Sequence, residues 1–105
     1  MKFEFIESPV FAHYLSDYLA DDEYAALQDF LCAYPDAGDM IRDSGGVRKL
    51  RWGRPGSGKS GGVRVCYYVR NRAGKILMLV IYAKSAKDSI PGHVLKAIKE
   101  EMEDA

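Results

Sequence analysis

Eight consecutive residues have the types and spacing of a phosphate-binding loop. Residues 53–60 read Gly-Arg-Pro-Gly-Ser-Gly-Lys-Ser, which satisfies the pattern G-x-x-x-x-G-K-S. In such loops backbone N–H groups hold nucleotide phosphates, and a helix must begin at the lysine to supply them. Here two glycines follow, and residues 63–69 then read Val-Arg-Val-Cys-Tyr-Tyr-Val, which favours a strand. We therefore expect no nucleotide triphosphate site, and we interpret the segment as a strand–loop–strand hairpin that carries basic side chains.

The charges of this 105-residue chain balance to zero but are segregated along it. Ten Lys/Arg and one acid lie between Arg42 and Lys75, whereas the remaining residues carry five bases and fourteen acids. Such a basic segment is typical of a polyanion site. The alternative is a solvated, salt-bridged sheet surface. We favour a site because several of the bases fall inside expected strands, at positions that can share a face. These bases are Lys49, Arg51, Arg64 and Arg70.

Hydrophobic periodicity predicts an α+β domain with the element order β-α-α-β-β-β-α. Ser8 and Pro9 are typical of the cap and first turn of a helix, which we expect to end near Leu19. Asp21 or Asp22 is expected to cap a second helix, which stops before a proline. The expected strands are Lys2 to Glu7, Val47–Trp52, Val63–Arg70 and Ile76–Ala83, and a last helix begins near Pro91. The apolar run at residues 76–81 indicates a central strand covered on both faces.

Period-two alternation places basic residues of neighbouring strands on one face of the sheet. If Leu50 and the apolar residues of the next strand pack on the helices, Lys49, Arg51 and Arg64 converge on the opposite, concave side. Tyr82 and Lys84, at the end of the last strand, can meet them there. Four cations beside an aromatic ring can neutralise phosphate and hold an unpaired base. No carboxylate pair or histidine lies in this region of the sequence.

Length and composition limit the classes of protein. The chain is expected to form one domain, residues 1–105, with a single modest core. No stretch approaches the roughly 18 consecutive apolar residues of a membrane span, and the N-terminus lacks a signal-peptide profile. Cys32 and Cys66 are far apart and have no C-x-x-C spacing or nearby His pair. We therefore expect reduced thiols in a cytoplasmic protein, with no metal site and no cofactor.

Four segments of the chain carry a resemblance to a known family. Residues 45–51 read Gly-Gly-Val-Arg-Lys-Leu-Arg, residues 58–68 read Gly-Lys-Ser-Gly-Gly-Val-Arg-Val-Cys-Tyr-Tyr, and residues 79–84 read Leu-Val-Ile-Tyr-Ala-Lys. With the turn Pro-Asp-Ala-Gly-Asp at residues 35–39, they resemble the RelE/HigB-type toxins of type II bacterial toxin–antitoxin systems. The likeness covers roughly Phe3 to Met102. It implies a small RelE-like domain of the microbial RNase type, with a twisted, mainly antiparallel four-stranded sheet, two N-terminal helices and a C-terminal helix.

The resemblance also implies an activity. Such toxins are endoribonucleases (mRNA interferases) that inhibit translation by cleaving mRNA, typically in the A site of the small ribosomal subunit, without a metal ion. The RNA 2′-OH attacks the adjacent phosphate and leaves a 2′,3′-cyclic or 3′-phosphate, while basic side chains stabilise the developing charge. By position in the pattern, the catalytic residues are Lys49, Arg51, Arg64 and Lys84, with Tyr82 for base stacking or proton transfer. Further RNA contacts are expected from Arg48, Trp52, Arg54, Lys59, Tyr68 and Arg70. The general acid stays unassigned.

A cognate antitoxin, a small helix-turn-helix protein, is the remaining implied partner. It can add a strand to the exposed edge at Val47–Trp52, or cover Lys49, Arg51 and Arg64 with an acidic helix. It can also block entry to the ribosome from outside the basic face. Two other classes of function stay open: a non-catalytic RNA- or ribosome-binding module, and an antitoxin-binding protein without cleavage activity.

Overall fold

The computed structural model describes residues 2–53, 62–83 and 89–103, and it has the expected order of elements with one additional strand. The elements are β1 (Glu4–Glu7), α1 (Pro9–Tyr18), α2 (Asp21–Ala33), β2 (Asp39–Met40), β3 (Arg48–Trp52), β4 (Val63–Arg70), a 3-10 turn (Asn71–Ala73), β5 (Lys75–Ala83) and α3 (Gly92–Glu103). The first strand is shorter than predicted and begins at Glu4. Within the described ranges, no helix has the length and apolar character needed to cross a membrane.

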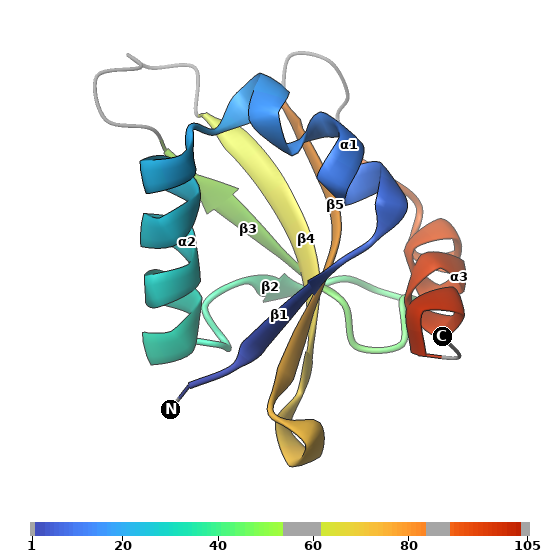
Figure 1. Cartoon of the computed structure of the whole chain (residues 1–105). Helices are drawn as coiled ribbons and strands as arrows, with labels where there is room; N and C mark the ends of the chain where they lie inside the picture. Colours follow the sequence, from blue (N-terminus) through green and yellow to red (C-terminus); the bar gives the residue numbers. More distant parts are fainter. Residues whose placement is uncertain (1, 54–61, 84–88, 104–105) are drawn as a thin grey trace.

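The sheet has five strands in the order β1-β5-β4-β3-β2 (Figure 1). β1 runs parallel to β5, and the other neighbours are antiparallel. The prediction of four strands was therefore wrong by one, because β2 pairs with β3 through Asp39 and Met40. The expected central strand, β5, lies between β1 and β4, whereas β4 occupies the middle of the sheet.

Helices cover both faces of the sheet, which produces two apolar cores (Figure 1). The core under α1 and α2 includes Phe11, Leu27, Leu50, Val65 and Tyr67. The core under α3 includes Val47, Cys66, Leu77, Leu79 and Leu95. β5 contributes buried side chains to both cores, as its apolar run predicted.

One extra residue in β5 changes which face its last side chains occupy. Cys66 of β4 is opposite Val80, whereas the next residue of β4 is opposite Met78, so Leu79 has no partner of its own. Leu79 and Val80 consequently both pack in the core under α3. Beyond this bulge the alternation is reversed, and Tyr82 lies on the same face as Cys66.

The first residues of α1 are fixed by a buried serine. Ser8 is 2% exposed, its Oγ accepts a hydrogen bond from the Phe11 N–H at 3.0 Å, and it donates to the Leu79 carbonyl at 2.7 Å. This confirms the predicted cap and also ties α1 to the bulge in β5. At α2 the prediction was wrong: Ala20 is the cap residue, and the Glu23 carboxylate accepts from its N–H at 2.8 Å.

We predict that Ser8→Ala destabilises the protein by about 1–2 kcal/mol, because it removes a helix cap and leaves a buried carbonyl without its donor. Urea denaturation would measure the loss. Ser16→Ala, at an exposed position of the same helix, is the matched control and should change stability little. Equal stability of the two variants would contradict the prediction.

Candidate functional site

Three strands bring the predicted basic residues together in two cross-strand rows. Arg51 of β3 lies opposite Arg64 of β4, which in turn lies opposite Tyr82 of β5. One pleat away, Lys49 lies opposite Cys66. Directly opposite residues of antiparallel strands point to the same face, with Cβ atoms about 4.5–5.5 Å apart. Lys49, Arg51 and Arg64 therefore converge on one face of the sheet, which we call the basic face.

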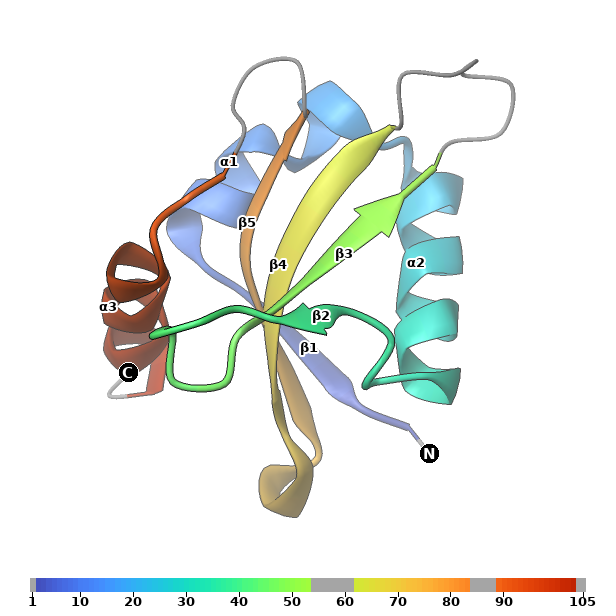
Figure 2. The same cartoon turned by 180° about the vertical axis from the view of Figure 1, so that it is seen from behind.

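The basic face is the one that carries α3, which leaves part of it open. Figure 2 looks onto this face, and no helix lies in front of the upper parts of β3 and β4. Arg51 is exposed and Lys49 is half-buried, whereas Arg64 is only 7% exposed. The face thus has a recessed guanidinium with two more accessible cations beside it, an arrangement suited to a phosphodiester group.

Burial keeps the two protic side chains next to these cations neutral. It raises the pKa of the Cys66 thiol to about 12, although the nearby Lys49 charge opposes the shift. Burial also raises the pKa of Tyr82, assisted by Cys66 and opposed by Arg64. Cys66 is therefore a protonated core thiol and not a nucleophile at neutral pH.

Tyr82 lies beside Arg64 as expected, but its ring is 7% exposed and packs in the core under α3. A ring at this depth is not available to stack on a base, so the structure argues against that predicted function. Its hydroxyl has no hydrogen-bond partner among the described residues. An apolar pocket of about 220 Å³ adjoins it, lined by Val10, Tyr14, Val80, Ile81 and Ile90.

Two predicted RNA contacts lie on the other face of the sheet. Trp52 packs against Phe30 of α2, with ring centroids 5.4 Å apart. Arg48 donates to the carbonyl oxygens of Asp36 and Gly38 at 3.2 and 2.8 Å. The alternation that gathers Lys49 and Arg51 sends these two side chains to the α2 side, so neither can join the basic face.

Two further residues that were predicted to contact RNA, Tyr68 and Arg70, contact α3 instead. The Lys99 ammonium lies 4.5 Å from the centre of the Tyr68 ring and donates to the Gly45 carbonyl at 3.0 Å. Arg70 lies 3.8 Å from the Glu103 carboxylate, at the end of β4 remote from Arg64. These contacts hold α3 against the sheet, which accounts for both residues structurally.

Three predicted site residues, Arg54, Lys59 and Lys84, lie outside the described residues. The segment just after the phosphate-loop pattern is described, and it is strand β4 rather than the helix that a nucleotide site requires. The expectation of a strand there is confirmed. Within the described ranges, no three His, Cys, Asp or Glu side chains come together as a metal site would need.

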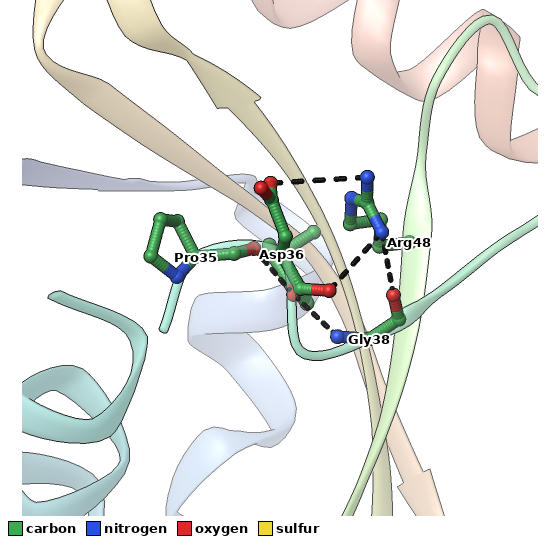
Figure 3. Close-up of polar contacts among 5 residues, drawn as sticks. Pro35, Asp36, Gly38 and Arg48 are labelled. Carbon is green, nitrogen blue, oxygen red and sulfur yellow. Dashed lines mark hydrogen bonds and ion pairs between the residues drawn. The ribbon is translucent and has the colours of Figure 1, made fainter. Parts of the chain in front are cut away.

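A partly buried polar network fixes the turn between α2 and β2 (Figure 3). The Tyr67 hydroxyl donates to the Pro35 carbonyl at 2.8 Å and accepts from the Gly38 N–H at 2.9 Å. Arg48 binds the same turn and lies 3.8 Å from the Asp36 carboxylate. A Cβ atom on Gly38 would lie 3.0 Å from the Lys49 carbonyl and from the Tyr67 ring, so a side chain does not fit without displacement. We refer to these contacts as the turn clamp.

The turn clamp fixes the backbone next to a site residue that the sequence analysis missed. Asp39 follows Gly38 directly, and it lies opposite Lys49 in the β2–β3 pairing. Ile41, two residues later, packs in the core under α3. Because alternate residues of an extended segment point to the same face, the side chain of Asp39 also lies on the basic face. No carboxylate pair was noted in this region of the sequence, and the fold brings the single carboxylate of Asp39 beside Lys49. The only sequence signal was the Pro-Asp-Ala-Gly-Asp turn, whose contact with β3 depends on the fold.

Solved structures place this architecture among known proteins. A mutant of the E. coli toxin RelE, in the free state, matches with a TM-score of 0.57 over 95% of this chain and 98% of that chain. The chain has the fold of RelE. Sequence identity is 14%, and no protein-family model matches. The predicted RelE-like fold is therefore confirmed, apart from the number of strands, and the chemistry has to be argued from the residues of this chain.

We predict that Tyr67→Phe destabilises the protein by about 1–3 kcal/mol, because the Gly38 N–H and the Pro35 carbonyl each lose a hydrogen-bond partner. Thermal or urea unfolding would detect the change. Tyr14→Phe removes a hydroxyl from an exposed tyrosine and is the matched control. A Tyr67→Phe variant as stable as this control would show that the turn clamp contributes nothing.

Proposed function

We propose that this protein is the toxin of a toxin–antitoxin system and an endoribonuclease that cleaves mRNA and inhibits translation. The observation that carries the proposal is the cross-strand row of Arg51 and Arg64, with Lys49 beside it, on the open part of a RelE-like sheet. Two guanidinium groups on directly opposite residues can both donate hydrogen bonds to one phosphate group. The RelE fold supports the toxin assignment by analogy, and the site residues support the chemistry.

The reaction that suits these residues is internal transesterification of RNA. The 2′-oxygen attacks the adjacent phosphorus, the bond from phosphorus to the 5′-oxygen breaks, and a 2′,3′-cyclic phosphate remains. Negative charge accumulates on the non-bridging oxygens of the phosphate during this step. Arg64, recessed and fixed by packing, and the more exposed Arg51 and Lys49 would stabilise that charge, and preorganised donors of this kind are effective catalysts.

Two macromolecular partners follow from the proposal. The substrate is mRNA bound to the ribosome, which the RelE-like fold supports by analogy. The second partner is an antitoxin. β2 covers Arg48 and Lys49 of β3, so strand addition is restricted to the unpaired edge at Leu50–Trp52. An acidic segment seated there would also cover the basic face.

We predict that Arg64→Ala and Arg51→Ala each lower RNA cleavage by about 10²–10³-fold, the usual loss when one transition-state contact is removed. Cleavage of mRNA would be followed by 5′-end mapping with and without ribosomes. Arg51→Ala is informative even if the buried Arg64 is needed for folding, because Arg51 is exposed. Arg72→Ala, in the exposed turn after β4, is the control and should retain activity.

Failure of the wild-type protein to cleave RNA under any of these conditions, despite binding it, would replace the proposal with a non-catalytic RNA-binding module. If neither Arg51→Ala nor Arg64→Ala lowers cleavage, the active site is not on the basic face.

A further inference from the structure

The proposed cleavage needs a group that accepts the proton of the 2′-hydroxyl, and the cations of the basic face cannot do so while they are charged. Of the other side chains on this face, Cys66 is a buried, protonated thiol and Tyr82 is a buried phenol. Tyr68 is covered by Lys99. Among the described residues, Asp39 is the carboxylate that lies directly opposite one of the three cations.

Asp39 is placed for contact with substrate. It is exposed, and it lies directly opposite Lys49, so the two Cβ atoms are about 4.5–5.5 Å apart. Arg51 is one pleat further along the same face of β3, at roughly 7 Å by strand geometry. Asp39 forms no ion pair within the described part of the chain, so both oxygens are available to accept a proton.

The surrounding structure holds this carboxylate in position. A two-residue edge strand is marginal alone, yet the residue immediately before Asp39 is fixed from two directions. Tyr67 binds the Gly38 N–H and Arg48 binds the Gly38 carbonyl, while the absence of a side chain lets this residue approach the Lys49 backbone. Two large polar side chains of the opposite face thus fix the backbone next to one carboxylate, which is the kind of support that a catalytic group requires.

We propose that Asp39 is the general base of the RNA cleavage reaction. In this step the 2′-hydroxyl proton passes to the Asp39 carboxylate as the 2′-oxygen bonds to phosphorus. The bond from phosphorus to the 5′-oxygen breaks, and the 5′-oxygen takes a proton from water. The hydroxide so formed removes the proton from Asp39 and restores the carboxylate. The inference rests on the proposed function.

The test is cleavage of a short RNA, or of mRNA bound to ribosomes, by Asp39→Asn. This variant keeps the shape of the side chain but cannot accept the proton, and kcat should fall by about 10²-fold or more. KM should stay the same or decrease, because a negative charge beside Lys49 and Arg51 has been removed. Asp29→Asn, on the exposed surface of α2, is the matched control with unchanged kinetics.

The pH dependence separates a base from a structural residue. The charged groups that face Asp39 are Lys49 opposite it and Arg51 beyond, and Asp36 lies in the same turn. A general base contributes to the pH profile of kcat, so the profile of Asp39→Asn should differ from that of the wild type. Asp39→Glu, which restores a carboxylate, should recover about tenfold of the lost rate.

The outcomes distinguish this inference from the function on which it rests. If the wild type cleaves RNA and Asp39→Asn retains kcat within twofold, Asp39 is not the base, while the ribonuclease assignment stands. If Asp39→Asn loses rate but keeps the wild-type pH profile, proton acceptance is also excluded. If the wild type cleaves no RNA at all, both proposals fail together.

Discussion

A cation that is buried in a β-sheet must be kept apart from the apolar side chains next to it in sequence, and β4 does this by strict alternation. Arg64 stands between Val63 and Val65, which are fully buried on the other face. The same alternation in β3 separates Arg51 from Leu50 and Trp52. Because Arg51 and Arg64 are directly opposite, the strand pairing places two guanidinium groups on the same part of one face. An anionic group bound there can accept hydrogen bonds from both.

The faces of β3 and β4 could be predicted because they depend only on local alternation. Lys49, Arg51 and Arg64 accordingly lie where the sequence placed them. The same rule contradicts the expectation for Arg48 and Trp52. In the alternation of β3 these two side chains share a face with Leu50, which is the α2 side. They were assigned to RNA by residue type, and their packing partners come from distant parts of the chain. Tyr68 and Arg70 were likewise assigned without knowledge of where α3 would dock.

Other features could not be predicted from one sequence. β2 has only two residues, Asp and Met, and neither has a strong preference for strands, so its pairing is imposed by the turn clamp. The bulge at Leu79 leaves no mark in a continuously apolar run, yet it decides that Tyr82 rather than Ile81 adjoins Arg64. Asp39 was missed because the short strand that carries it was not foreseen, and its position opposite Lys49 depends on that strand.

The separation of charge between strands and helices has a consequence for how the molecule would approach a polyanion. The bases are concentrated in residues 42–75, which include β3 and β4, whereas α1, α2 and α3 carry many of the acids. A molecule with no net charge is drawn only weakly toward a polyanion, but its electric dipole experiences a torque in the field of that polyanion. At physiological ionic strength this torque acts within roughly 8 Å of the surface. Productive and unproductive encounters therefore start at similar rates. The orientation in the last step selects between them, with the basic face toward the polyanion and α1 and α2 on the far side of the sheet.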